Sequence, residues 1–310
     1  MIKSFEEQIR QKALELGFCS IGFAETVPLI KESEYFKEWI EKGYNADMKY
    51  LSENIEKRFN PTHILPEAKT IIVTGCNYFS SYTHPSLSSK DVGKVSRYAW
   101  GEDYHKVILN KLENLSEMIK ILNPEAETKA YVDTGSIHEK QWAVRAGIGW
   151  QGKNSLILTN NYGSFIFLGI IITSVKLLPD SPIPNHCGDC NKCIESCPTN
   201  AITAPGVIDA RRCIAYWTIN KFDIPGEVAG NLDGCIFGCD ICQDVCPWNH
   251  NIPYSSNKEF YPKYGETTLD LSYIDTMTQI EFTEKFRNNP IKKLTLDGLK
   301  RNASVLRKCI

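Results

Sequence analysis

The sequence predicts an α/β (α+β) domain that is followed by a cysteine-rich module and a short helical tail. Apolar strand patterns alternate with amphipathic helical patterns up to about residue 180, as in a sheet layered with helices. Pro179, Pro182 and Pro184 then mark a linker. Nine of the twelve cysteines follow between residues 181 and 252, and helical patterns return after them. We therefore expect three segments, at residues 1–180, 181–252 and 253–310.

The individual elements follow from the spacing of apolar residues and from end signals. Residues 5–16 have apolar side chains at helical spacing, and Gly17 is a natural C-cap. Ser136 and Glu139 fit the S-x-x-E pattern of a capping box, which predicts a helix over residues 137–146. The other expected strands are 18–24, 70–74, 128–132, 155–158 and 164–175, and the other expected helices are 29–39, 48–55, 104–122, 280–286 and 296–306.

Composition indicates an ordinary globular chain. The 310 residues are 42% hydrophobic and 23% charged, with a formal net charge of −2. The longest apolar stretch, residues 165–175, is about half of the ~20 residues that span a bilayer. Residues 1–17 are charged and amphipathic, unlike a secretory segment. We therefore expect no membrane association and a reducing, cytoplasmic location.

Near-neutral charge gives no support for a broad nucleic-acid-binding surface and leaves room for a local patch. Six lysines and arginines crowd residues 291–310, where Asp297 is the only acid. Charge alone favours a solvated helix face over nucleic-acid contact for this cluster.

The most specific pattern is a run of cysteines with the spacing C-x2-C-x2-C-x3-C-P. Its members are Cys187, Cys190, Cys193 and Cys197. Bacterial two-cluster ferredoxins use this run to hold 4Fe-4S clusters, so the module is expected to be ferredoxin-like. A second, incomplete run ends in the same way and comprises Cys239, Cys242 and Cys246. Four-cysteine zinc sites share the C-x2-C spacing, but two C-x3-C-P endings fit 4Fe-4S clusters better.

Crossed ligation is expected, because the cysteine before the proline binds the other cluster in such runs. One cluster would then take Cys187, Cys190, Cys193 and Cys246. The other cluster would take Cys197, Cys239, Cys242 and one further thiolate. Spacing alone leaves Cys213 and Cys235 open as that fourth ligand.

The first domain needs a function of its own, since a two-cluster ferredoxin needs only about 60 residues. Asp133 follows an expected strand, where a carboxyl could act as a general acid, although capping the turn is the simpler interpretation of this residue alone. Residues 149–155 form a glycine-rich loop with a lysine, suited to anionic or amide-bearing ligands. The sequence does not match the G-x-x-x-x-G-K-[ST] pattern of a P-loop, and no G-x-G-x-x-G lies between an expected strand and an expected helix, so neither familiar route to nucleotide binding is supported.

Taken together, these segments resemble the epoxyqueuosine reductases, cobalamin-dependent enzymes that complete queuosine synthesis on tRNA. The match covers most of the chain. Besides the first cysteine run, the segments that carry it are 58–61, 98–101, 103–105, 132–133, 147–155, 211–214 and 238–249. The resemblance implies that residues 1–180 bind cobalamin and that Cys213 is the missing cluster ligand. It leaves Cys235 as a spare thiol, together with Cys19, Cys76 and Cys309.

The resemblance also implies the cofactor contacts. They are Arg58, Asp133, Gly152, Lys153, Asn154, Ser155, Tyr216 and Thr218. Asp103 and His105 are present, but residue 108 is Ile, so the D-x-H-x-x-G signature of histidine-ligated cobalamin is incomplete. We therefore expect base-off cobalamin without a protein histidine on cobalt.

The implied reaction is the two-electron, two-proton reduction of the epoxide of epoxyqueuosine to an alkene, with release of water. Asp133 matches the proton donor of the family, and we expect desolvation to raise its pKa. The substrate is a tRNA with a GUN anticodon, and an unidentified low-potential donor supplies the electrons. A monomer is expected. Many members continue into helical repeats beyond the segment that matches residues 298–306, so the tail is expected to lack a tRNA-contacting extension.

Two alternatives remain open from the sequence. One is a reductive dehalogenase-like cobalamin enzyme, although that class uses a tyrosine as proton donor. The other is a two-cluster electron carrier without catalysis.

Overall fold

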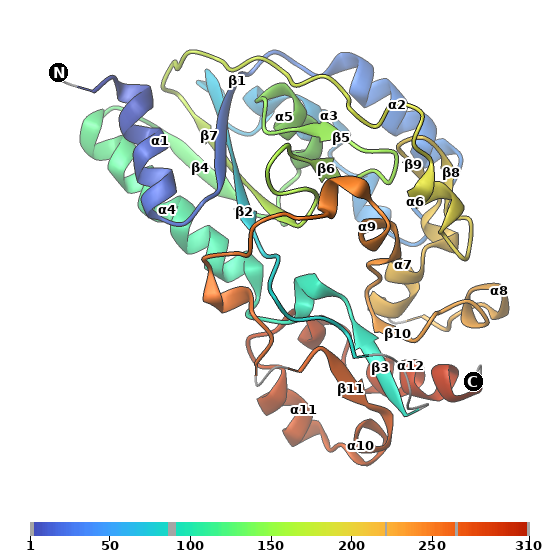
Figure 1. Ribbon diagram of the computed structural model, residues 1–310. Helices are drawn as coiled ribbons and strands as arrows, with labels where there is room; N and C mark the ends of the chain where they lie inside the picture. The colour runs from blue at the N-terminus through green and yellow to red at the C-terminus, as the bar shows by residue number, and fades with distance from the viewer. Residues whose placement is uncertain (1–2, 86–90, 221, 264–265, 309–310) are drawn as a thin grey trace.

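The computed structural model describes residues 3–85, 91–220, 222–263 and 266–308, so Cys309 lies outside the described residues. A four-stranded antiparallel sheet forms the centre of the N-terminal half, in the order β1-β2-β7-β4 (Figure 1). Its strands are β1 (Ser20–Glu25), β2 (Thr70–Asn77), β7 (Ile166–Thr173) and β4 (Thr128–Tyr131). Every residue of β2 is buried, because β2 is an inner strand with both faces covered.

Helices cover both faces of this sheet. Helices α1 (Phe5–Glu15) and α4 (Tyr104–Leu122) share a core with Ile72 on one face. Helix α5 (Glu139–Arg145) packs with Ile71 on the other face, because successive strand residues point to opposite sides. Figure 1 shows α1 beside α4 at one flank of the sheet and α5 at the other. The α/β (α+β) fold class is confirmed, with an antiparallel sheet.

A second sheet joins distant parts of the chain. Strand β3 (Val92–Val95) lies between β10 (Cys235–Phe237), which is parallel to it, and β11 (Thr268–Asp270), which is antiparallel. Helix α12 (Leu296–Lys308) packs on β10 and shares its core. Each of the three expected segments therefore contributes a strand to one sheet, and the segment boundaries remain a prediction.

The remaining elements are short. The other helices are α2 (Ile30–Glu41), α3 (Ile55–Phe59), α6 (Lys192–Glu195), α7 (Ile214–Ile219), α8 (Gly226–Ala229), α9 (Ile241–Asp244), α10 (Leu271–Thr276) and α11 (Gln279–Lys285). Two hairpins comprise β5 (Trp150–Gln151) with β6 (Ile157–Leu158), and β8 (Ile202–Ala204) with β9 (Val207–Ile208). A 3-10 turn, Pro290–Lys293, precedes α12. Within the described ranges, no helix combines the length and apolar character that a membrane span requires.

Two local predictions are wrong. Residues 48–55 form a 3-10 turn, Lys49–Leu51, and the helix begins only at Ile55. The capping box of Ser136 and Glu139 does not form, because α5 begins at Glu139 itself and has no side-chain cap. The backbone N–H of His138 is bonded to the carbonyl of Arg58, which holds this segment outside the helix. The Glu139 carboxyl is therefore available for another partner.

Candidate functional site

A cavity of 1710 Å³ lies where the N-terminal half meets the cysteine module. Its walls come from α2, α3, the loop after β4, the segment after β5, the β8–β9 hairpin and the 3-10 turn before α12. Small-molecule pockets typically measure about 300–1,000 Å³, so this cavity has room for an unusually large ligand.

Five of the eight expected cofactor contacts line this cavity. They are Arg58, Asp133, Gly152, Lys153 and Ser155. These residues come from α3, from the loop after β4 and from the glycine-rich loop, so the fold brings together segments that are almost one hundred residues apart. Their assignment as direct contacts remains a prediction.

The other three expected contacts do not line the cavity. Asn154 is buried, and its side-chain amide donates to the carbonyl of Cys242 at 3.4 Å. Thr218 is fully buried, and its hydroxyl donates to the carbonyl of Ile214 at 2.8 Å. Tyr216 bonds through its hydroxyl to Asp47. These side chains support the surrounding backbone in the structure.

Asp133 lies two residues after the end of β4, and its side chain lines the cavity. Its side chain is 64% exposed, and its Oδ2 accepts a hydrogen bond from the hydroxyl of Tyr104 at 2.7 Å. His105 Nε2 lies 3.6 Å from the same oxygen. The φ of Asp133 is 54°, a left-handed conformation that aspartate tolerates better than most residues. The carboxylate thus faces the cavity. It does not cap the following turn, which was the simpler interpretation of this residue.

The expected rise in the pKa of Asp133 is wrong. Desolvation by the surrounding protein raises this pKa, but hydrogen bonds with His105 and Tyr104 outweigh that effect and hold the pKa below its ordinary value. The neighbouring Glu139 behaves in the opposite way. Burial, together with the negative charge of Asp133, raises the pKa of Glu139 to about 8. At neutral pH the proton of this pair therefore belongs to Glu139.

His105 is held at both ring nitrogens. Nδ1 lies 2.7 Å from Asp103 Oδ1, and Nε2 lies 3.0 Å from Lys293 Nζ. Beside it, the Tyr104 ring stacks on Phe167 with centroids 4.3 Å apart, which fixes the direction of its hydroxyl. Lys293 belongs to the basic cluster of the tail, and this exposed side chain lines the cavity beside His105.

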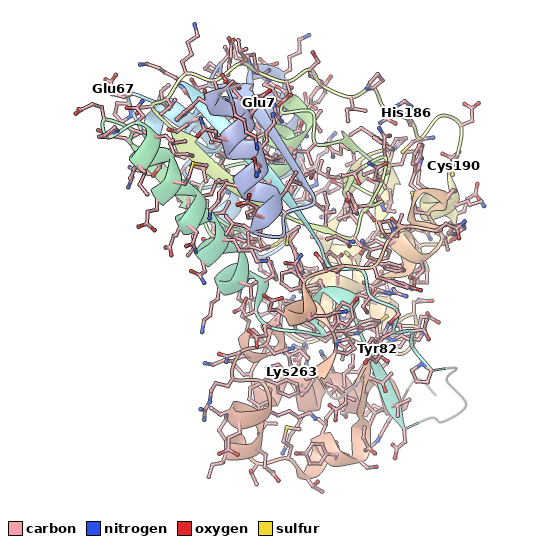
Figure 2. The ribbon with its side chains drawn as sticks, turned by 60° about the vertical axis from the view of Figure 1, so that its left-hand side comes forward. Glu7, Glu67, Tyr82, His186, Cys190 and Lys263 are labelled. Atoms are coloured by element: carbon pink, nitrogen blue, oxygen red, sulfur yellow. The ribbon has the colours of Figure 1, made fainter. Side chains whose placement is uncertain are left out.

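The cysteines gather into two groups. Burial raises the pKa of Cys193, and the thiols of Cys246, Cys187 and Cys190 raise it further, so these four lie close together. Cys190 is exposed and lies at the edge of the molecule in Figure 2. The expected first set is thus assembled by the fold.

The second group lies deeper. Burial raises the pKa of Cys213 to about 11, and Cys239 and Cys197 contribute to this rise. Burial also raises the pKa of Cys242, with further contributions from Cys239 and Cys213. Cys235, the open alternative, is buried in the core of the second sheet, where its thiol is hydrogen-bonded to Cys239.

Nine buried side-chain polar atoms have no hydrogen-bond partner among the described residues, and two of them lie at the expected cofactor sites, where they test whether the cofactors fit. One is Trp150 Nε1, whose indole packs against Cys246 and Cys187. The other is Nε of Arg58, which lines the cavity. Buried N–H groups are almost always hydrogen-bonded, so these positions suit acceptors supplied by a cluster and by a cavity ligand. The residues present fit both kinds of cofactor.

Sequence reasoning missed several residues of this site. Glu139 was assigned to a helix cap because S-x-x-E is a local pattern, whereas its partner is the backbone of Asp133. Tyr104 lies inside a recognised segment, but only the stacking on Phe167 reveals its orientation. Lys140 lines the cavity, and the described contacts give it one hydrogen bond, to the carbonyl of Ser155 at 2.9 Å.

Comparisons with known proteins place these features in a family. The family model "Epoxyqueuosine reductase QueG, DUF1730" matches residues 58–134, and the model "4Fe-4S double cluster binding domain" matches residues 186–249. The second match supports iron–sulfur clusters over zinc. The epoxyqueuosine reductase of Atelocyanobacterium thalassa (isolate ALOHA) is 41% identical over 305 residues, which cover 97% of this chain and 98% of that protein.

Solved structures agree. A crystal structure of epoxyqueuosine reductase with an epoxyqueuosine-modified tRNA-Tyr stem loop has a TM-score of 0.93 and 32% identity, covering 98% of this chain and 81% of that one. A structure of the Bacillus subtilis enzyme, in which a catalytic loop that carries an aspartate is swung out of the active site, has a TM-score of 0.91 and 31% identity, with the same coverage of the two chains. The chain belongs to the epoxyqueuosine reductase family.

Proposed function

We propose that the protein reduces epoxyqueuosine to queuosine at the wobble position of tRNA, with cobalamin and two 4Fe-4S clusters as cofactors. The observation that carries this proposal is one cavity with acid groups and thiol groups around it. Asp133 lies on its wall, and Lys140, also on the wall, is close enough to Cys242 and Cys213 for their charges to act on its pKa. Electrons and protons can therefore reach the same substrate.

Cobalamin fits the cavity in size and in chemistry. When bound, it supplies a strongly reducing cobalt centre to the epoxide. Its amide side chains need many hydrogen-bond partners, and Arg58, Lys153 and Ser155 on the wall offer donors. Both ring nitrogens of His105 already have protein partners, which supports a base-off cofactor without a histidine on cobalt.

The two thiol groups define a route for electrons. The first cluster would be held by Cys187, Cys190, Cys193 and Cys246, and the second by Cys197, Cys213, Cys239 and Cys242. Exposed Cys190 puts the first group at the surface, where a low-potential donor can approach. The Cys213 and Cys242 thiols lie near the cavity, next to Lys140. When loaded with clusters, the two groups would provide a route for electrons from the surface through the deeper group to the cavity.

Asp133 serves as the acid. Its carboxyl projects into the cavity from a loop that is anchored by a backbone hydrogen bond to Glu139, and Tyr104 fixes its orientation. The departing epoxide oxygen needs a proton when its C–O bond breaks, and a carboxyl positioned on the wall delivers it. The resting carboxylate must first be protonated, because its pKa is lowered.

The substrate is a nucleotide of an anticodon loop that carries a GUN anticodon. Unstacked loop bases can be turned outward into a protein pocket, and the cavity is open enough to admit one. Aromatic side chains at its rim, including exposed Tyr35, offer surfaces for stacking. The protein acts in the cytoplasm as a monomer.

The proposal is tested by reconstituting the chain anaerobically with iron, sulfide and cobalamin and adding an epoxyqueuosine-modified stem loop under a strong reductant. We expect queuosine by nucleoside mass spectrometry, and none in the control without cobalamin. Loaded protein that forms no queuosine would reject the proposal and favour the electron-carrier alternative.

A further inference from the structure

Glu139 is a second carboxyl on the cavity wall, and the acid role proposed for Asp133 does not involve it. It is the first residue of α5, lines the cavity, and accepts a hydrogen bond from the backbone N–H of Asp133 at 2.6 Å. The adjacent Lys140 donates instead to the carbonyl of Ser155 at 2.9 Å. Over the part of the chain that the structure describes, the ion pairs do not include Glu139. A carboxyl enclosed in this way, without an ion-pair partner, favours its neutral form.

The two carboxyls of this wall differ in their partners. Asp133 accepts from the Tyr104 hydroxyl and lies near His105, so its charge is stabilised. Glu139 accepts one backbone N–H, and its carboxyl is affected by the charges of Asp133 on the preceding loop, His105 on α4 and Lys140 on its own helix. Burial and Asp133 dominate, and they raise the pKa of Glu139 to about 8. Paired carboxyls whose environments separate their pKa values commonly divide acid and base roles.

The proposed reduction consumes two protons. The first goes to the epoxide oxygen as one C–O bond opens and leaves a hydroxyl group. The second goes to that hydroxyl as its C–O bond breaks, so that water leaves and two electrons form the alkene. One carboxyl holds one proton, so Asp133 must be reloaded within each turnover.

We propose that Glu139 is the proton reservoir that reloads Asp133. This inference rests on the proposed function. The proton leaves the Glu139 carboxyl for the Asp133 carboxylate, directly or through one water molecule, and no electron moves. Glu139 becomes a carboxylate and regains its proton from solvent through the open cavity. It acts through Asp133 and does not touch the substrate, so it is a positioning and supplying residue.

The test variant is Glu139→Gln in protein loaded with clusters and cobalamin. Glutamine can still accept the Asp133 N–H, so the loop is kept in place, but it cannot deliver an acidic proton. Wild-type single-turnover rates should fall as pH rises through about 8, because Glu139 loses its proton there. We expect Glu139→Gln to react about 10-fold more slowly at pH 7 and to lose this alkaline decline. Glu117→Gln, on the exposed face of α4, is the matched control and should behave as wild type.

A second readout does not depend on turnover. Infrared spectra of the loaded protein without substrate should show a protonated carboxyl band at pH 7 that is absent in Glu139→Gln. In Asp133→Asn the band should remain but should titrate at a lower pH, because the negative charge that helps to raise the pKa of Glu139 is gone. A band that persists in Glu139→Gln, or a variant with the wild-type rate and alkaline decline, would overturn the inference. If the wild type forms no queuosine at any pH, the proposed function fails, and the infrared band alone then decides where the proton resides.

Discussion

The two sides of the cavity encode their chemistry in different ways. On the thiol side, seven of the eight expected cluster ligands lie at regular spacing in two short runs, and only Cys213 comes from outside these runs. On the acid side, Asp133, Glu139, Tyr104 and Lys293 come from separate segments without a shared motif. The residues for electron transfer are thus specified mainly by local sequence spacing, whereas the residues for proton transfer are brought together by tertiary contacts.

This difference implies that the two functions can be separated by substitution. A change on the acid side should leave the clusters intact, because no described hydrogen bond joins Asp133 to a cysteine. A change on the thiol side should remove iron without moving the acid groups.

Asp133→Asn should have the largest effect. Asparagine keeps the shape and can still bond to Tyr104, but it carries no acidic proton. General acids typically contribute about 100-fold to 10,000-fold, so queuosine formation should fall by that factor. Iron content and the cobalamin spectrum should stay as in wild type. Normal turnover by this variant would dismiss Asp133 as the acid.

Cys213→Ala should sharpen the comparison from the thiol side. We expect about four of the eight irons to be lost, because one of two cubane sites loses a ligand. Cys235→Ala is the matched control, since it removes the neighbouring thiol that we leave out of the ligand set. Iron analysis and electron paramagnetic resonance measure both. Iron loss in the Cys235 variant with full iron in the Cys213 variant would reverse the assignment.

Tyr104→Phe should have a moderate effect on the acid side. In the wild type, the 2.7 Å hydrogen bond from Tyr104 lowers the pKa of Asp133. The substitution removes this bond, so the pKa of Asp133 should rise. Lost orientation should slow turnover about 10-fold, equivalent to about 1.4 kcal/mol. Single-turnover rates measured against pH report both changes. An unchanged pH profile would show that the Tyr104 hydroxyl does not control Asp133.

The smallest change is expected at His105. Bound cob(II)alamin should show no nitrogen superhyperfine splitting, and His105→Ala should leave its electron paramagnetic resonance signal unaltered, because the ring nitrogens face Asp103 and Lys293. A nitrogen-split signal that vanishes in the variant would put histidine on cobalt.

The sequence predicted much of the fold. The strand expected at residues 70–74 is the core of β2, and the long helix over residues 104–122 is α4 as expected. A continuous apolar run made β2 visible, and apolar residues at helical spacing made α4 visible. The antiparallel order of the sheet was not predictable, since alternating strand and helix patterns do not specify how strands pair.

The acid groups and the cofactor contacts were less predictable from the sequence than the cluster cysteines. Glu139 fits a capping box by spacing, yet His138 is tied to Arg58 and delays the helix, so the carboxyl turns to Asp133. The pKa of Asp133 depends on α4 and on the turn before α12, which are distant in sequence. Asn154 lies in a recognised segment and Thr218 lies four residues beyond one, but Asn154 donates to the carbonyl of Cys242, and Thr218 accepts from the N–H of Gly238. Each of these outcomes is set by a tertiary contact that no local pattern contains.

The central claim is that electrons from the thiol side and protons from the acid side meet at one substrate. The most direct measurement is a single turnover with pre-reduced, reductant-free protein that carries both clusters and cobalamin. Mixed with epoxyqueuosine stem loop, it should form about one queuosine per chain while its clusters become oxidised, since two one-electron clusters store the two electrons required. Clusters that stay reduced while no queuosine forms would contradict the account.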